Sequence, residues 1–161
     1  MGNDSPIITI CDYGGSTGGG ILRVLDRLRD ILDRRQYELT VTSLATHDPE
    51  ALARNQPFID RYYNETSAEL PPTEFFEAFD LIISIKGPLH WSRFPELVVD
   101  NFWKMLRPGG ELIVAASHTG SHYDIVQGID VAQYLEESGH FEVIDIERWK
   151  AYHYMTLKKN N

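Results

Sequence analysis

The sequence has 161 residues, a formal net charge of −9 and one cysteine. This length suits one domain, so we expect residues 1–161 to form a single unit. No apolar run approaches the roughly 18–20 residues that cross a bilayer, and the N-terminus lacks a signal-peptide pattern, which favours a cytoplasmic protein without a membrane partner. The basic residues alternate with acidic ones and form no stripe that could neutralise phosphates. We therefore expect a small-molecule substrate or a protein partner, and no nucleic acid.

Strand and helix patterns alternate in the first half of the chain. Residues 7–11 form an almost wholly apolar run, which predicts a strand buried on both faces and a buried, inert thiol at Cys11. Residues 21–35 place apolar side chains at three- and four-residue steps between charges, the pattern of an amphipathic helix. The β-branched residues over 37–44 predict a second strand.

A short helix and a third strand are predicted next. Asp48 as N-cap and Pro49 at the first helical position predict a helix over residues 51–55. Residues 57–63 are expected to form the third strand.

The second half of the chain repeats the alternation. Apolar patterning predicts strands over residues 80–85 and 111–116 and helices over residues 95–106 and 125–138. The turn Pro108-Gly109-Gly110 ends the first of these helices, because proline cannot continue a helix. Residues 141–149 and 152–158 are strands so close in sequence that they must pair as an antiparallel hairpin.

These patterns together predict the fold class. Strands alternating with helices imply an α/β, Rossmann-like, doubly wound sheet, with helices on both faces. We expect seven strands, mostly parallel, with an antiparallel C-terminal hairpin. In such sheets ligands bind beyond the carboxyl ends of the strands, where the strand order reverses.

A glycine-rich loop, residues 12–20, connects the first predicted strand to the first helix. Glycine lets a ligand approach the backbone and accepts positive φ angles, so the loop is a candidate nucleotide site, although a tight structural turn also explains it. A phosphate-binding loop needs Gly-Lys-Ser/Thr, which is absent here. Ser16 stands where the dinucleotide fingerprint has glycine, so NAD fits poorly.

Residues 10–18, Ile-Cys-Asp-Tyr-Gly-Gly-Ser-Thr-Gly, resemble the first motif of class I S-adenosylmethionine-dependent methyltransferases. That motif is written D-x-G-x-G-x-G, and Ser16 replaces its middle glycine. Four further stretches resemble later motifs of the family in order and spacing, namely residues 69–84, 89–91, 106–114 and 137–143. The Leu-Arg-Pro-Gly-Gly turn within residues 106–114 is the most specific of them.

The resemblance implies S-adenosylmethionine as the cofactor. It places Asp12, Gly14, Ser16 and Gly18 around the methionine part, Ser84 and Lys86 on the other side, and Ser67 where the family often has an acid facing the adenine. The family's ribose-binding acid is missing from the end of the second strand; Asp48 is the nearest acid, with the helix N-cap as its alternative role. Glu65 or Glu69 is the available substitute for the adenine-facing acid.

Three histidines are candidate general bases. His90 follows the fourth predicted strand, and His118 and His122 follow the fifth, which puts all three at the ligand edge of the sheet. A histidine there can take a proton from a substrate because its pKa is near neutrality; the alternative is a hydrogen-bonded loop histidine. No metal site is expected, since residues 117–122 offer histidines without a cysteine or a well-spaced carboxylate.

The sequence thus predicts an enzyme, an S-adenosylmethionine-dependent methyltransferase that acts on an oxygen, nitrogen or carbon of a small molecule. The main alternative is a methyltransferase-like protein without methyl transfer, serving as a partner subunit or a repurposed enzyme. An NAD-dependent oxidoreductase matches the loop less well. Helices that commonly cover the substrate in the family have no counterpart before residue 7, so we expect a lid from residues 57–77 or from another subunit, in a homodimer or a heteromeric complex.

Overall fold

The computed structural model describes residues 6–27, 36–45, 49–85, 87–117, 131–149 and 152–161. The strands in these ranges are β1 (Ile8–Asp12), β2 (Tyr37–Thr42), β3 (Arg61–Tyr63), β4 (Phe79–Ser84), β5 (Leu106–Ser117), β6 (Phe141–Trp149) and β7 (Tyr152–Lys159). The helices are α1 (Gly19–Arg27), α2 (Pro49–Asn55), α3 (Pro88–Trp91), α4 (Pro95–Met105), α5 (Val131–Glu137) and the 3-10 helices η2 (Gln56–Phe58) and η3 (Thr73–Phe75). None of the helices described here has the length and apolar character needed to span a membrane.

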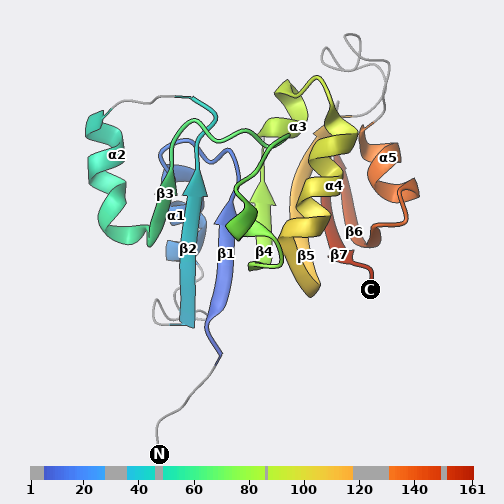
Figure 1. Ribbon diagram of the computed structural model, residues 1–161, viewed down its shortest axis with the longest axis horizontal. Coiled ribbons are helices and arrows are strands. Elements are labelled where there is room, and N and C mark those ends of the chain that lie inside the picture. The colour runs from blue at the N-terminus through green and yellow to red at the C-terminus, as the bar shows by residue number, and fades with distance from the viewer. Residues whose placement is uncertain (1–5, 28–35, 46–48, 86, 118–130, 150–151) are drawn as a thin grey trace, which may run out of the picture.

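One sheet contains all seven strands, in the order β3-β2-β1-β4-β5-β7-β6 (Figure 1). β7 is antiparallel to both of its neighbours, β5 and β6, and the other described pairs are parallel. The predicted seven-stranded, mostly parallel sheet with an antiparallel C-terminal hairpin is confirmed. The chain runs outward from β1 through β2 to β3 and then returns to β4 on the other side of β1, so the strand order reverses between β1 and β4. Ligands of doubly wound sheets bind at such a reversal, beyond the carboxyl ends of the strands.

Consecutive residues of β1 face opposite sides of the sheet and belong to two cores. Ile10 packs with Ile21 and Leu25 of α1. Cys11 belongs to the larger core, which α4 and α5 close and in which Phe102 is fully buried. Figure 1 shows the three layers, with α4 and α5 in front of the sheet and α1 behind it. The predicted burial of the lone thiol is confirmed, and burial raises the pKa of Cys11.

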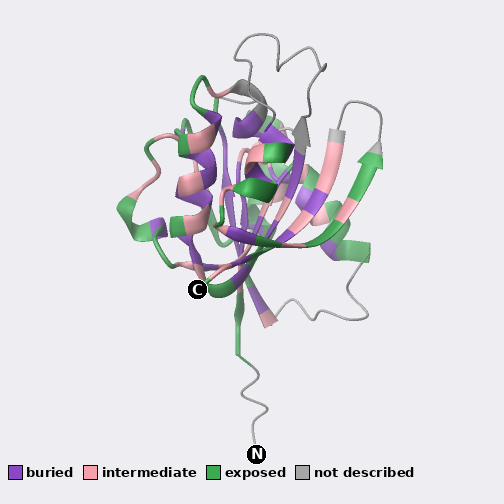
Figure 2. Cartoon of the chain, turned by 90° about the vertical axis from the view of Figure 1, so that its right-hand side faces the viewer, coloured by how far each residue is buried: buried purple, intermediate pink, exposed green. Residues whose placement is uncertain are grey.

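Burial decreases from the middle of the sheet toward its β6 edge. Figure 2 shows buried positions concentrated in the central strands and on the inner sides of the helices, whereas β6 is largely exposed or half-buried. The buried Lys159 donates from Nζ to the Leu106 carbonyl at 2.7 Å and lies 4.5 Å from the centre of the Trp103 ring. His140 stacks on the same ring and contacts Asp100 at 2.8 Å. These contacts attach the hairpin and the turn before it to α4.

The third strand is shorter than predicted. Only Arg61–Tyr63 form β3, and the preceding residues 56–58 form η2, so the predicted strand over 57–60 is wrong. The physical reason is Pro57, which has no N–H for a strand ladder and whose fixed φ suits the first turn of a helix.

The fifth strand begins earlier than predicted. Leu106 already pairs with Phe79, and the next regular pair is Glu111 with Leu81, so five residues of β5 advance against two of β4. The Pro-Gly-Gly turn occupies this irregular stretch. The turn predicted from the sequence is therefore present, but inside the strand ladder rather than before it.

The remaining boundaries agree within a few residues where they are described. α1 begins two residues before the predicted start, and the predicted helix beyond Arg27 lies outside the described residues. β2 ends at Thr42 instead of residue 44. Residues 125–130 also lie outside the described part, and α5 is followed by Gly139 with a φ of +73°, the left-handed conformation that commonly ends a helix.

Candidate functional site

The carboxyl ends of β1, β2 and β4 point to the same edge of the sheet, and the loops that follow them lie together there (Figure 1). Backbone hydrogen bonds fix the loops after β2 and β3 against each other. The Ser43 N–H donates to the Tyr63 carbonyl at 2.9 Å, and the Thr66 N–H donates to the Ser43 carbonyl at 2.8 Å. Ser43 is fully buried and its hydroxyl donates to the Ala45 carbonyl. The segment after β3 is thereby held beside the end of β2.

The glycine loop after β1 takes its shape from three left-handed residues. The φ angle is +78° at Gly14, +62° at Ser16 and +78° at Gly18. Glycine adopts this region without strain, whereas the Cβ of serine makes it costly. A Cβ at Gly18 would also lie 2.8 Å from Cδ1 of Ile59. Every second residue of the sequence motif, from Gly14 to Gly18, thus has a left-handed backbone conformation.

Asp12 packs over the loop that it precedes. A Cβ at Gly15 would lie 1.9 Å from Asp12 Oδ2, so the carboxylate fills space that any other side chain would need. Asp12 is only 7% exposed, and the loss of hydration raises its pKa from 3.8 to about 7. A cation beside this carboxyl would favour its ionised form, so the position suits a positively charged ligand group.

Neighbouring strands hold the glycine loop in place. The Tyr13 N–H donates to the Ile83 carbonyl at 2.8 Å, and the Tyr13 hydroxyl donates to the Ser67 carbonyl at 3.0 Å. The Gly14 N–H donates to Thr42 Oγ1 at 2.9 Å. The loop is therefore attached to the ends of β2 and β4 and to the segment after β3.

Ser84 at the end of β4 has an unsatisfied hydroxyl. Its Oγ is buried and makes no hydrogen bond to any residue that the structure describes. A Cβ at Gly87 would lie 2.5 Å from this oxygen and 2.7 Å from the Tyr13 carbonyl, so glycine at this position keeps the approach open. Buried hydroxyls without a partner are uncommon, and this one marks a position for a polar ligand atom.

A cleft of about 260 Å³ adjoins the glycine loop. It is lined by Leu44, Glu65, Thr66, Ser67, Ala68, Glu69, Pro88 and Ser92. Gly14 borders it, since a Cβ there would lie 3.0 Å from Cδ of Pro88. Asn101 of α4 donates to the carbonyls of Ala68 and Glu69 at 2.8 and 3.1 Å, and Ser92 Oγ donates to Glu69 Oε1. Two carboxylates thus line a cleft wall that α4 fixes.

Six of the predicted cofactor-binding residues lie at this edge, Asp12 and Ser84 as the last residues of strands and the others on loops: Asp12, Gly14, Ser16, Gly18, Ser67 and Ser84. The other two, Asp48 and Lys86, lie outside the described residues. The catalytic candidates His118 and His122 also lie outside them, as does the side chain of His90. The roles of these residues stay predictions.

Three residues shape the site without having been predicted from the sequence. Gly15 leaves space for the Asp12 side chain, Thr42 accepts a hydrogen bond from the glycine loop, and Gly87 keeps the Ser84 hydroxyl accessible. The glycine before Pro88, directly after a buried strand, was the available signal for the last of them. Within the described ranges, no group of three histidine, cysteine or acidic side chains could hold a metal ion.

The fold is similar to that of several solved methyltransferases. The CurJ carbon methyltransferase matches with a TM-score of 0.72 and 15% identity, over 100% of this chain and 50% of that one. The trans-methyltransferase CalH, solved with S-adenosylhomocysteine, matches with a TM-score of 0.73 and 18% identity, over 97% of this chain and 52% of that one. This chain thus spans about half the length of CurJ and of CalH.

A third structure is matched over more of its length. It is the Burkholderia thailandensis 1,6-didemethyltoxoflavin-N1-methyltransferase, solved with 1,6-didemethyltoxoflavin and S-adenosylhomocysteine. The TM-score is 0.68 at 17% identity, over 97% of this chain and 72% of that one. No protein-family model and no curated protein matches the sequence. These likenesses confirm the fold predicted from the sequence.

Proposed function

We propose that this chain binds S-adenosylmethionine across the glycine loop and the adjoining cleft and transfers its methyl group to a small molecule. The observation that carries this proposal is the packing of Asp12 on Gly15 at the strand-order reversal, with the unsatisfied Ser84 hydroxyl at the end of the neighbouring strand. Two solved neighbours of the same fold, CalH and the 1,6-didemethyltoxoflavin-N1-methyltransferase, contain S-adenosylhomocysteine, which supports the choice of cofactor.

The glycine loop suits the charged end of that cofactor. The methionine part of S-adenosylmethionine carries an ammonium group and a sulfonium, and either cation would lower the pKa of Asp12 back toward its ordinary value. Ser84 Oγ is available to the same end as a donor or an acceptor. Gly14, Ser16 and Gly18 complete the residues that we assign to this part.

The cleft suits the nucleoside end. Its volume of about 260 Å³ is below the roughly 300–1,000 Å³ of pockets that take a whole small ligand, so it suits part of the cofactor. Glu65 and Glu69 offer carboxylate acceptors to ribose hydroxyls or to the adenine amino group, and Leu44 and Pro88 offer apolar contact to the base. The two glutamates would then replace the ribose-binding acid that is missing from the end of the second strand and the adenine-facing acid that is missing at the position of Ser67.

The chemistry needs alignment more than covalent participation by the protein. S-adenosylmethionine supplies a methyl group on a sulfonium, and S-adenosylhomocysteine leaves when an oxygen, nitrogen or carbon of the substrate takes that methyl group. The loops after β1 and β4 would hold the methyl donor in line with the nucleophile. A nucleophile that carries a proton must also lose it, and His90, His118 and His122 are the candidate bases.

We further propose that the substrate side is closed by another subunit, in a homodimer or a heteromeric complex, or by part of residues 57–77. Residues 65–69 of that segment line the cleft wall, so this part of it is already beside the nucleoside end. The chain's net charge of −9 favours a small-molecule substrate over a nucleic acid.

Methyl transfer can be tested directly. The protein is incubated with S-adenosylmethionine carrying a tritiated methyl group and with fractions of a small-molecule extract. The proposal predicts a labelled product in at least one fraction and its loss in Gly15→Ala. Binding of S-adenosylhomocysteine without transfer to any fraction would favour the methyltransferase-like alternative, and absence of both binding and transfer would contradict the proposal.

A further inference from the structure

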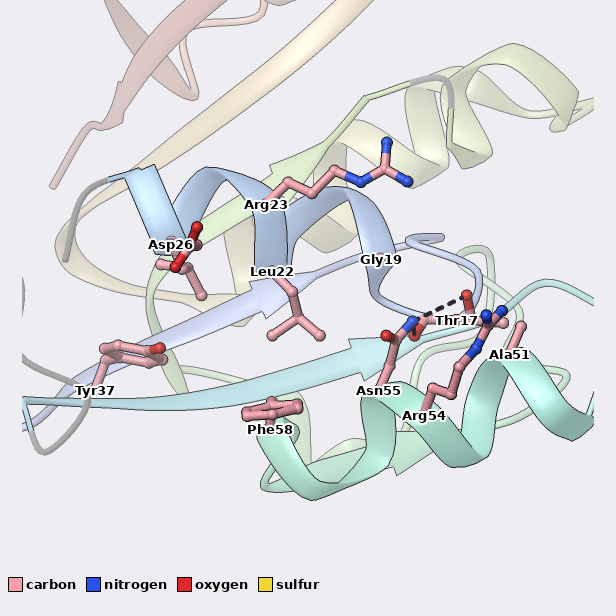
Figure 3. Close-up of a pocket in the computed structure, with 11 residues that line it drawn as sticks. Thr17, Gly19, Leu22, Arg23, Asp26, Tyr37, Ala51, Arg54, Asn55 and Phe58 are labelled. Atoms are coloured by element: carbon pink, nitrogen blue, oxygen red, sulfur yellow. Dashed lines mark hydrogen bonds between the residues drawn. The ribbon is translucent and has the colours of Figure 1, made fainter.

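A second, larger cavity lies on the α1 side of the sheet, away from the cofactor cleft. Its volume is about 780 Å³, within the roughly 300–1,000 Å³ of small-ligand pockets. It is lined by Thr17, Gly19, Leu22, Arg23, Leu25, Asp26, Tyr37, Ala51, Arg54, Asn55 and Phe58. α1 forms one wall and α2 with η2 the other, as Figure 3 shows. None of these residues lines the cofactor cleft.

The body of this cavity is apolar. Leu22 and Leu25 come from α1, Tyr37 from the start of β2, and Phe58 from η2. Leu25 and Tyr37 are buried, whereas Phe58 is 56% exposed. An apolar ligand body would cover this ring and bury its surface.

Two arginines give the cavity a positive end. In Figure 3 the guanidinium groups of Arg23 and Arg54 lie on the side of Thr17 and Gly19, whereas Phe58 lies away from them. Neither guanidinium makes a hydrogen bond or an ion pair within the described part of the chain. One acidic side chain, Asp26, also lines the cavity, and Figure 3 shows it away from both guanidinium groups. The end with Arg23 and Arg54 is therefore positively charged and suits an anion.

Two other arginines in the described residues, Arg61 and Arg107, have acidic partners. Arg107 Nη1 lies 3.0 Å from Asp80 Oδ2, and Arg61 Nη2 lies 3.9 Å from Glu38 Oε2. The rim of the cavity is also ordered from the loop side, because Asn55 Nδ2 donates to the Thr17 carbonyl at 3.0 Å. Arg23 and Arg54 thus line a cavity whose rim is ordered.

We infer that this cavity binds a small amphipathic anion, with an aromatic or aliphatic body against Leu22, Tyr37 and Phe58 and a carboxylate, sulfonate or phosphate between Arg23 and Arg54. The charge of the ligand is set by the two guanidinium groups and its apolar body by the walls. This site is separate from the proposed cofactor site, and its occupation does not depend on methyl transfer.

A matched pair of fluorescent probes tests the inference. The dye 8-anilino-1-naphthalenesulfonate carries an aromatic body and a sulfonate, and N-phenyl-1-naphthylamine carries the same aromatic system without the charge. We expect saturable fluorescence enhancement with the sulfonate dye. The neutral dye should bind at least about fivefold more weakly, because it has no sulfonate to contact the two guanidinium groups; each tenfold in affinity corresponds to about 1.4 kcal/mol.

Variants locate the binding. Arg23→Gln and Arg54→Gln should each weaken binding of the sulfonate dye by about fivefold. Binding of the neutral dye should stay unchanged, since only the charged contact is lost. Phe58→Ser should weaken both dyes. Arg61→Gln is the matched control, because Arg61 is exposed and does not line the cavity. All four positions are exposed, and thermal melting by circular dichroism confirms that each variant folds.

The inference would be overturned by no saturable binding of the sulfonate dye, by equal affinity for the two dyes, or by a loss in Arg61→Gln as large as in Arg54→Gln. Dye binding that Phe58→Ser leaves intact would also overturn it, since the dye would then sit elsewhere. S-adenosylhomocysteine binding, measured in the same variants, should stay unchanged.

Discussion

The carboxylate of Asp12 occupies the space that a side chain at Gly15 would need, with Oδ2 1.9 Å from the position of a Cβ at that residue. This contact connects the last residue of β1 to the loop that starts α1. It keeps a carboxyl with a pKa of about 7 at the reversal of strand order, where the fold binds ligands. The proposed cofactor site depends on it.

Gly15→Ala should therefore damage the site. The added methyl group forces Asp12 out of its place, and such overpacking costs about 1–3 kcal/mol of unfolding free energy. We expect a lower midpoint in urea and at least tenfold weaker binding of S-adenosylhomocysteine. Gly20→Ala is the control: Gly20 is on α1, and a Cβ there meets no atom within 4 Å. That variant should gain about 0.5–1 kcal/mol from helix propensity and bind normally; equal behaviour of the two variants would refute the contact's role.

The stability of the protein should fall between pH 4 and pH 7 because of Asp12. Well below pH 3.8 the carboxyl is protonated in both states; between its unfolded pKa of 3.8 and its folded pKa of about 7, the folded state largely keeps the proton and the unfolded state largely loses it. The unfolded state is then favoured as the pH rises, by roughly 4 kcal/mol in all, and the loss is complete above about pH 7.

Urea denaturation at a series of pH values measures this loss, and Asp12→Asn should remove most of it. Asp80 is the group with the opposite sign: its contacts with Thr9 and Arg107 hold its pKa below the ordinary value, so its contribution is lost only as the pH falls through the acid range. A wild-type and an Asp12→Asn protein with the same slope between pH 5 and pH 7 would show that Asp12 is not the cause.

Ser16 should tolerate glycine better than a β-branched residue. Its φ of +62° costs a non-glycine residue about 1–2 kcal/mol, and the greater freedom of glycine in the unfolded chain offsets about 0.4–1 kcal/mol of that. Ser16→Gly should equal or slightly exceed the wild type in thermal midpoint, and Ser16→Val should fall below it. A marked loss in Ser16→Gly would mean that the serine hydroxyl, and not the backbone, determines this position.

Glu69 should contribute to cofactor affinity. We expect Glu69→Gln to weaken the binding of S-adenosylhomocysteine by about tenfold, since a charge-assisted hydrogen bond to the nucleoside would be lost. Adenine alone and adenosine, titrated in parallel, show whether the ribose or the base is the partner. Glu74→Gln is the control, because Glu74 is exposed on η3 and does not line the cleft. Equal affinities in the two variants would remove Glu69 from the site.

The architecture could be predicted from the sequence because it follows from residue patterns within short segments of the chain. The alternation of buried runs with amphipathic segments predicts the parallel sheet, and the closeness of the last two strands predicts their hairpin. Where a predicted strand conflicted with a backbone restraint, the prediction failed: residues 57–63 were predicted to form one strand, but Pro57 cannot join a strand ladder.

The site itself was predictable only in part. The glycine loop has a sequence signature because its left-handed residues need particular side chains. Three other features have no sequence signature: the packing of Asp12 on Gly15, the hydrogen bond that Thr42 accepts from the loop, and the unsatisfied Ser84 hydroxyl. They depend on side-chain directions in three strands that meet only in the folded chain. The bulge in β5 likewise depends on pairing with β4, which no local window of sequence contains.

Calorimetric titration of the wild-type protein with S-adenosylhomocysteine, beside Gly15→Ala, tests the central claim most directly. We predict saturable heat with a stoichiometry of one for the wild type, tightening as the pH rises toward 7 because binding favours ionised Asp12. Gly15→Ala should bind at least tenfold more weakly. No heat from the wild type at millimolar ligand would contradict the account.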